Sequence, residues 1–98
     1  MIKFNKKELF EKIVSFLKAN NASKIAVFGS FANDTDSENS DVDIIVEFID
    51  QISLLKFVGI QQHLSDYLGI DVDLLTEDSI SPYLLPHIKK EMIILYGK

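Results

Sequence analysis

Residues 24–46 have the sequence KIAVFGSFANDTDSENSDVDIIV, and this stretch decides the fold. Its first part, Lys24 to Phe28, is apolar and rich in β-formers, and Gly29 closes it, which predicts a buried strand that ends in a turn. Residues 33–40 contain no apolar side chain, so they predict a solvated loop. Residues 42–48 are apolar again and predict a second strand. Polar residues therefore stand where the first strand ends and where the second begins.

Asp41 and Asp43 stand at the start of that second strand. Side chains two positions apart on a strand point the same way, so the two carboxylates share one face of the sheet. Like charges this close repel, which raises a carboxyl pKa and destabilises the fold unless a divalent cation lies between them. Mg²⁺ prefers such hard oxygen ligands. The pair predicts a magnesium site, and the plainer alternative is a solvated strand end with two surface acids.

Gly29 and Ser30 stand at the end of the first strand, and ten residues separate Ser30 from Asp41. A glycine at a strand-to-helix turn lets the backbone approach a ligand closely. Backbone N–H groups and the Ser30 hydroxyl can then bind phosphate oxygens. Taken alone, this pair fits an ordinary turn equally well. Together with Asp41 and Asp43 it predicts a nucleotide site.

A third carboxylate comes from residues 70–75, IDVDLL, which alternate apolar and acidic and predict a strand with one carboxylate-bearing face. Asp71 and Asp73 both lie on that face, and the alternation does not choose between them. Three carboxylates holding two cations would form a two-metal site. One ion would lower the pKa of an attacking hydroxyl, and the other would neutralise a leaving pyrophosphate.

The remaining segments predict helices. Asn5 and Glu8 have the spacing of a capping box ahead of a helix that ends near Asn20. Residues 52–68 have apolar positions at helical spacing, and Gly69 stands where a helix C-terminal glycine belongs. Pro82 and Pro86 bracket a turn, and residues 87–96 predict a closing helix. The expected architecture is α/β (α+β), a small mixed β-sheet with helices packed mainly on one face, in the order α, β, β, α, β, α.

Length and composition narrow the class of protein. The 98 residues predict a single domain, 1–98. There is no Cys, which excludes disulfides, Cys-ligated zinc and a thiol nucleophile. No signal peptide or membrane-length apolar stretch is present in this sequence, so a soluble cytoplasmic protein is expected. The net charge is −5 and all ten basic residues are Lys, which argues against direct nucleic-acid binding.

Three segments together resemble a known family: residues 29–32 (GSFA), 40–46 (SDVDIIV) and 72–76 (VDLLT). The sequence resembles the minimal nucleotidyltransferases, small members of the DNA polymerase beta-like superfamily. The spacing between the GS and DxD motifs is similar to that of the antitoxin branch, which is paired with HEPN-domain toxins. The resemblance reaches the final predicted helix and so covers nearly the whole chain. It implies the polymerase-beta-like nucleotidyltransferase fold.

The resemblance also implies an activity and its site. AMP would move from ATP to a tyrosine hydroxyl of a HEPN toxin, usually encoded beside the antitoxin, and this would silence the toxin. Gly29 and Ser30 would bind the triphosphate. Asp41 and Asp43 would hold two Mg²⁺ ions, and Asp73, which the family match favours over Asp71, would complete the catalytic and metal site beside the acceptor.

The chain departs from the family at one point. Members commonly have Arg-Gly after the GSFA-like segment, and this chain has Asn33-Asp34. Lys24 or a basic residue of a partner would have to supply the missing cation. Two alternatives therefore stay open: a weak or inactive antitoxin that neutralises its toxin by binding, and nucleotidyl transfer to a small molecule. The sequence also leaves open the nucleobase, the acceptor and a homo- or hetero-oligomeric state.

Overall fold

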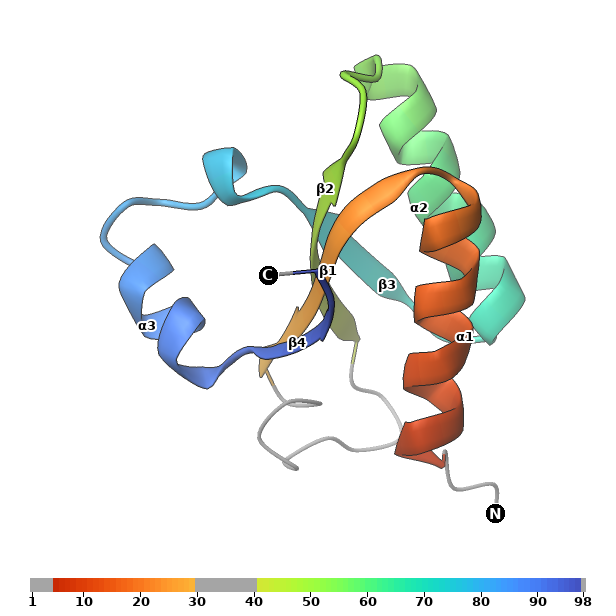
Figure 1. The fold of residues 1–98 in the computed structure, drawn as a ribbon, viewed down its shortest axis with the longest axis horizontal. Helices are drawn as coiled ribbons and strands as arrows, with labels where there is room; N and C mark the ends of the chain where they lie inside the picture. Colours follow the sequence, from red (N-terminus) through yellow and green to blue (C-terminus); the bar gives the residue numbers. More distant parts are fainter. Residues whose placement is uncertain (1–4, 30–40, 98) are drawn as a thin grey trace.

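The computed structural model describes residues 5–29 and 41–97, which form a four-stranded sheet of order β3-β2-β1-β4. In Figure 1 the two longer helices cover one face of this sheet, and the short helix that precedes the last strand lies on the other side. Strands β1 and β2 pair antiparallel, β2 and β3 pair parallel, and β1 and β4 pair antiparallel. The elements are α1 (Lys6–Ala19), β1 (Ala22–Phe28), β2 (Val42–Phe48), α2 (Leu54–Leu68), β3 (Val72–Leu75), the 3₁₀ helix η2 (Glu77–Ser79), α3 (Leu85–Glu91) and β4 (Ile93–Tyr96). The mixed sheet and the one-sided helix layer confirm the expected fold class.

Local signals fix the ends of both long helices. The Asn5 side chain accepts a hydrogen bond from the Glu8 N–H at the start of α1, as the capping box predicts. Ser53 accepts one from the Lys56 N–H at the start of α2. Gly69 ends α2 with φ 75°, a left-handed conformation that glycine adopts without steric cost. These contacts satisfy backbone groups that a helix leaves without partners at its ends.

The core lies between the sheet and the helices α1 and α2. Alternate strand residues point toward these helices and are buried together with one face of each helix. The other face of the sheet receives Lys24, Asp43 and Asp73, because side chains alternate along a strand. The buried residues of this core are Leu9, Ile13, Leu17, Ala22, Ile25, Val27, Val42, Ile44, Val46, Ile60, Leu64, Leu68, Val72 and Leu74. Ala26 and Ile45, which alternate with them along β1 and β2, are also fully buried. The carboxylates of interest therefore lie outside the main core.

The first turn of α2 departs from its apolar pattern. Leu54, Leu55 and Val58 have the spacing of a buried face, but they are exposed, Leu55 by 85%. The buried residues of α2 are Ile60, Leu64 and Leu68, which pack further along the helix. Figure 1 shows the start of α2 projecting beyond the sheet, so its first turn has no strand to cover it.

The expected closing helix over residues 87–96 is wrong in its second half. Helix α3 ends at Glu91, and residues 93–96 form β4 against β1. The sequence Ile93-Ile94-Leu95-Tyr96 favours a strand, and the free edge of β1 supplies the hydrogen-bond partners that select it. Pro86 falls in the first turn of α3, where a proline needs no N–H partner.

Among the described residues, no helix is long and apolar enough to cross a membrane.

Candidate active site

Asp43 and Asp73 stand opposite each other on neighbouring strands. The parallel pairing of β2 with β3 puts Val42 beside Val72 and Asp43 beside Asp73. Both valines are buried on the helix side of the sheet. Because side chains alternate, the two aspartates share the opposite face, at the ends where both strands begin. The structure thus brings together two of the three acids that the sequence singled out.

Burial and like charge both act on Asp43. Its side chain is half-buried, and this desolvation raises the pKa of its carboxyl, with repulsion from Asp73 and then from Asp41 adding to the effect. Asp41 precedes β2 and is exposed. Asp73 therefore acts on Asp43 electrostatically although the two come from separate strands. A cation placed here would relieve this repulsion.

Asp71 and Asp73 differ in a way that alternation alone did not reveal. Asp71 precedes β3, and its main-chain carbonyl accepts a hydrogen bond of 3.0 Å from the Val42 N–H. This bond ties the start of β3 to the start of β2. The acids whose charges raise the pKa of the Asp43 carboxyl, after its burial, are Asp73 and Asp41, and Asp71 is not among them. The register therefore places Asp73 beside Asp43.

Gly29 brings the end of β1 against the same carboxylate. Phe28 is the register partner of Asp43, and Gly29 follows it with φ 74°. A Cβ at Gly29 would collide with Oδ2 of Asp43. Only glycine allows this close approach in this backbone conformation. Ser30, Asn33 and Asp34 lie outside the described residues.

The donor set fits a hard divalent cation. Asp43 and Asp73 supply carboxylate oxygens, the ligands that Mg²⁺ prefers, and Mg²⁺ commonly takes only one or two of them. Within residues 5–29 and 41–97, no three His, Cys, Asp or Glu side chains converge closely enough to hold a metal by themselves. The remaining ligands would have to be substrate phosphate and water, as is usual for Mg²⁺.

Lys24 is paired with two acids, which argues against the suggestion that it replaces the missing arginine. Its ammonium contacts Glu77 at 3.1 Å and Glu47 at 4.0 Å, and its side chain is only 13% exposed. Glu77 also pairs with Lys89 of α3 at 3.2 Å. Hydrogen bonds from the two lysines lower the pKa of the Glu77 carboxyl. This network joins β1 to α3 on the face of the sheet opposite α1 and α2, and no local pattern indicates it, because 53 residues separate Lys24 from Glu77.

Comparison with known proteins identifies the fold and its chemistry. The family model for polymerase beta nucleotidyltransferases matches residues 11–98, which include both strands that carry the acids. The chain belongs to the polymerase beta nucleotidyltransferase family. The resemblance found from the sequence is thereby confirmed, and the chain is a nucleotidyltransferase by family.

Two relatives of this nucleotidyltransferase match nearly end to end. A proposed protein adenylyltransferase of Methanocaldococcus jannaschii, MJ1217, is 42% identical over 91 residues, which cover 91% of this chain and 93% of the relative. The protein adenylyltransferase MntA of Thermococcus cleftensis is 35% identical over 89 residues, covering 91% and 83%. Both relatives are named for the same reaction, the attachment of adenylate to a protein.

Two solved structures resemble this nucleotidyltransferase closely. A toxin–antitoxin crystal structure with AMP-PNP has a TM-score of 0.80 at 30% identity, covering 97% of this chain and 75% of that one. A Shewanella oneidensis complex of a tri-AMPylated HEPN toxin with its MNT antitoxin has a TM-score of 0.76 at 26% identity, covering 95% and 73%. The same fold thus occurs beside an AMPylated toxin.

Proposed function

We propose that this nucleotidyltransferase moves AMP from ATP to a tyrosine hydroxyl of a HEPN-domain toxin and so acts as its antitoxin. One observation carries the proposal: Asp43 and Asp73 lie side by side on neighbouring strands, and the backbone at Gly29 packs closely against the Asp43 carboxylate. The names of the relatives and the AMPylated toxin in a similar complex support the adenylyl group and the acceptor. A cytoplasmic location follows from such a partner and is part of the proposal.

The reaction requires an in-line exchange at the α-phosphorus of ATP. A bond forms between the tyrosine oxygen and the α-phosphorus, the bond from that phosphorus to the bridging oxygen breaks, and pyrophosphate leaves. Asp73 lies beside Asp43 and is exposed, which leaves it open to the acceptor hydroxyl, and the phenolic proton leaves to solvent. Gly29 and Ser30 are the residues proposed to hold the triphosphate, because the backbone at Gly29 lies directly against the Asp43 carboxylate.

Asp41 and Asp43 are the residues proposed to hold Mg²⁺, with Asp73 as a shared ligand. When bound, the ions would neutralise the triphosphate and the leaving pyrophosphate and lower the pKa of the acceptor hydroxyl. The raised pKa of Asp43 supports this role, because the fold holds its carboxylate against repulsion that a cation would remove.

The test is the intact mass of a HEPN-domain partner encoded beside this chain, after incubation with ATP and Mg²⁺. An increase by one or more AMP groups with the wild-type chain, absent with Asp41→Ala/Asp43→Ala, is the expected result. A complex that forms while the partner mass stays unchanged would instead identify an antitoxin that works by binding alone.

A further inference from the structure

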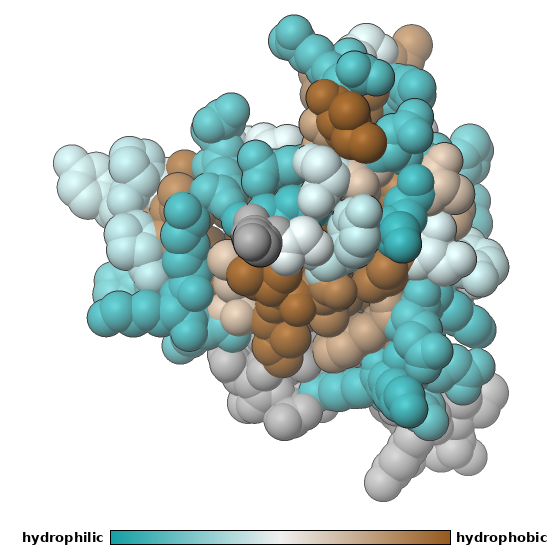
Figure 2. Space-filling model, viewed as in Figure 1, coloured by the Kyte–Doolittle hydropathy of each residue, from teal (hydrophilic) through white to brown (hydrophobic). Residues whose placement is uncertain are grey.

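The sheet ends at β4, and this edge is apolar. Strand β4 pairs with β1 on one side and is the last strand in the sheet order. Ile93, Ile94 and Tyr96 are exposed by 40%, 46% and 37%. The four residues of β4 carry no charge, although edge strands are commonly protected by lysine, proline or a covering segment. Figure 2 shows apolar side chains gathered over β4 and continuing toward α1.

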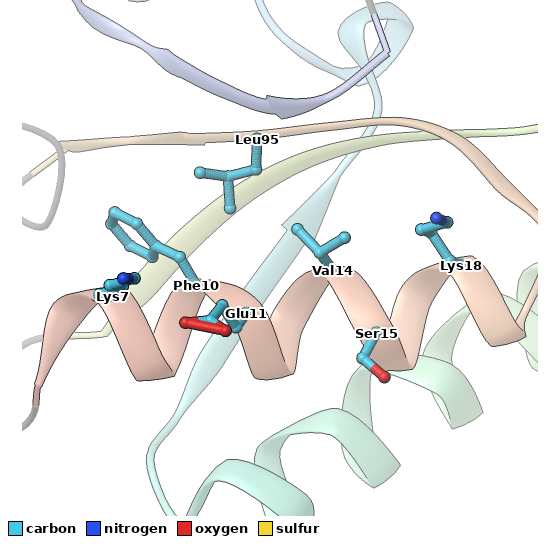
Figure 3. Close-up of a pocket in the computed structure, with 7 residues that line it drawn as sticks. All are labelled: Lys7, Phe10, Glu11, Val14, Ser15, Lys18 and Leu95. Atoms are coloured by element: carbon cyan, nitrogen blue, oxygen red, sulfur yellow. The ribbon is translucent and has the colours of Figure 1, made fainter.

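A shallow groove of about 850 Å³ runs beside this edge. In Figure 3, Leu95 points toward α1, while Phe10 and Val14 point back toward it. Charged residues rim these apolar side chains, with Lys7 and Lys18 at opposite ends of the helix. The groove and the edge of β4 therefore form one continuous surface, apolar in the middle and charged at its rim.

The charges on this surface complement themselves. A two-fold rotation axis perpendicular to the sheet, placed beside the free edge of β4 at the middle of the strand, would pair two β4 strands antiparallel and set two α1 helices antiparallel. Leu95 and Val14 line the same groove, and the Lys18 ammonium lies 4.7 Å from the Tyr96 ring, so β4 faces the second half of α1. Along the direction of α1, the axis then lies level with Val14 and Ser15.

Glu11 and Lys18 lie at equal distances from that axis, each about 5 Å along the helix. In the pair of copies, Glu11 of each therefore faces Lys18 of the other. Within the described part of this chain, Glu11 has no ion-pair partner of its own. Ser15, level with the axis, is small enough to let the helices approach. A two-fold interface needs such self-complementarity, because each patch must match itself.

We propose that this surface, β4 with the outer face of α1, binds a second copy of the chain, forming a dimer with a continuous sheet and two Glu11–Lys18 contacts. Backbone hydrogen bonds between the two β4 strands would supply pairing that the free edge lacks. The apolar groove residues would lose their exposure to water.

Sedimentation equilibrium of the wild-type chain over a wide concentration range tests the dimer. The expected result is a monomer–dimer equilibrium. Glu11→Lys and Lys18→Glu should each weaken it by about tenfold, because each change replaces two attractive contacts with two repulsive ones. The double variant Glu11→Lys/Lys18→Glu should recover dimerisation. Circular dichroism of each variant checks the fold.

A mixing experiment gives the sharpest test. When the two single variants are mixed, both contacts of the mixed dimer would again join a lysine of one copy to a glutamate of the other. The two variants should therefore associate with each other more strongly than either does with itself. A wild-type chain that stays monomeric at every concentration overturns the proposal. So does a wild-type dimer that neither single variant weakens. Monomeric variants that lose only binding to the HEPN partner would assign this surface to that partner instead.

Discussion

Asp43 on β2 and Asp73 on β3 are register partners on parallel strands, and their repulsion helps to raise the pKa of Asp43. The fold thus holds two acids together on a half-buried face and gains no stability from the contact. Groups held in unfavourable surroundings concentrate at functional sites, where a ligand compensates for them. The repulsion between these two acids should therefore be measurable both in stability and in activity.

Asp43→Asn should stabilise the chain in the absence of divalent cations and abolish adenylyl transfer. A neutral amide ends the repulsion, so the melting temperature in a chelating buffer should rise. Loss of transfer should exceed the roughly 10- to 100-fold cost of disturbing a group that only orients a metal ligand. A melting temperature several degrees below that of the wild type would contradict this account, because it would make the carboxylate structural.

The stability of the chain should depend on pH through Asp43. Because its folded pKa is raised, the native state holds its proton more tightly than the unfolded state does. The free energy of unfolding should therefore fall as pH rises from the pKa of this carboxyl in the unfolded chain to its higher pKa in the folded chain. Thermal melts across the acidic range should show this loss in the wild type and not in Asp43→Asn. Identical pH profiles for the two chains would rule it out.

Mg²⁺ should raise the melting temperature of the wild type, and this gain should depend on Asp73 and not on Asp71. Binding to the native state alone shifts stability by mass action. Asp73→Asn should shrink the gain and impair transfer. Asp71→Asn is the matched control, since Asp71 contacts β2 through its main chain. If both variants responded to Mg²⁺ equally, the register argument would fail.

Gly29→Ala should damage the site, and Gly69→Ala should damage only stability. Both glycines have φ near 75°, so either alanine costs about 1 kcal/mol of strain, or roughly 4–8 °C in melting temperature. A Cβ at Gly69 meets nothing within 4 Å, whereas one at Gly29 collides with Asp43. Transfer should therefore fall only in Gly29→Ala. Equal activity of the two variants would show that the close approach is incidental.

Glu77→Gln should destabilise the chain by about 1 kcal/mol, since it removes a charged hydrogen bond from the poorly exposed Lys24. The lowered pKa of Glu77 means that its contribution is complete above its unfolded pKa and is lost as pH falls through the folded pKa. Glu47→Gln is the control, because that exposed carboxylate lies 4.0 Å from Lys24 and should matter by less than about 0.5 kcal/mol. Urea unfolding at neutral and acidic pH measures both.

Local patterns predicted most of the fold and most of the candidate site. The capping signal at Asn5, the glycine after α2 and the apolar strands each depend on neighbouring residues, so a sequence displays them directly. Pairing between distant segments is different. Alternation along residues 70–75 did not separate Asp71 from Asp73, and only the family resemblance favoured Asp73. Its position beside Asp43 depends on the register of β3 against β2, which no local pattern encodes.

Strand β4 is a second feature that local sequence patterns did not determine. A short apolar segment such as residues 93–96 is compatible with a helix or a strand, and the free edge of β1 decides between them. Lys24 is the third case, because its partner Glu77 comes from a turn after β3. Contacts between distant segments, rather than propensity, determined each of these outcomes.

The most direct test of the central claim compares the initial rate of AMP attachment to the HEPN partner for the wild type, Asp43→Asn and Asp71→Asn, followed by intact mass with ATP and Mg²⁺. We predict steady gain of AMP groups with the wild type and Asp71→Asn and none with Asp43→Asn. Transfer by Asp43→Asn at the wild-type rate would contradict the assignment of the Asp43–Asp73 pair as the catalytic centre.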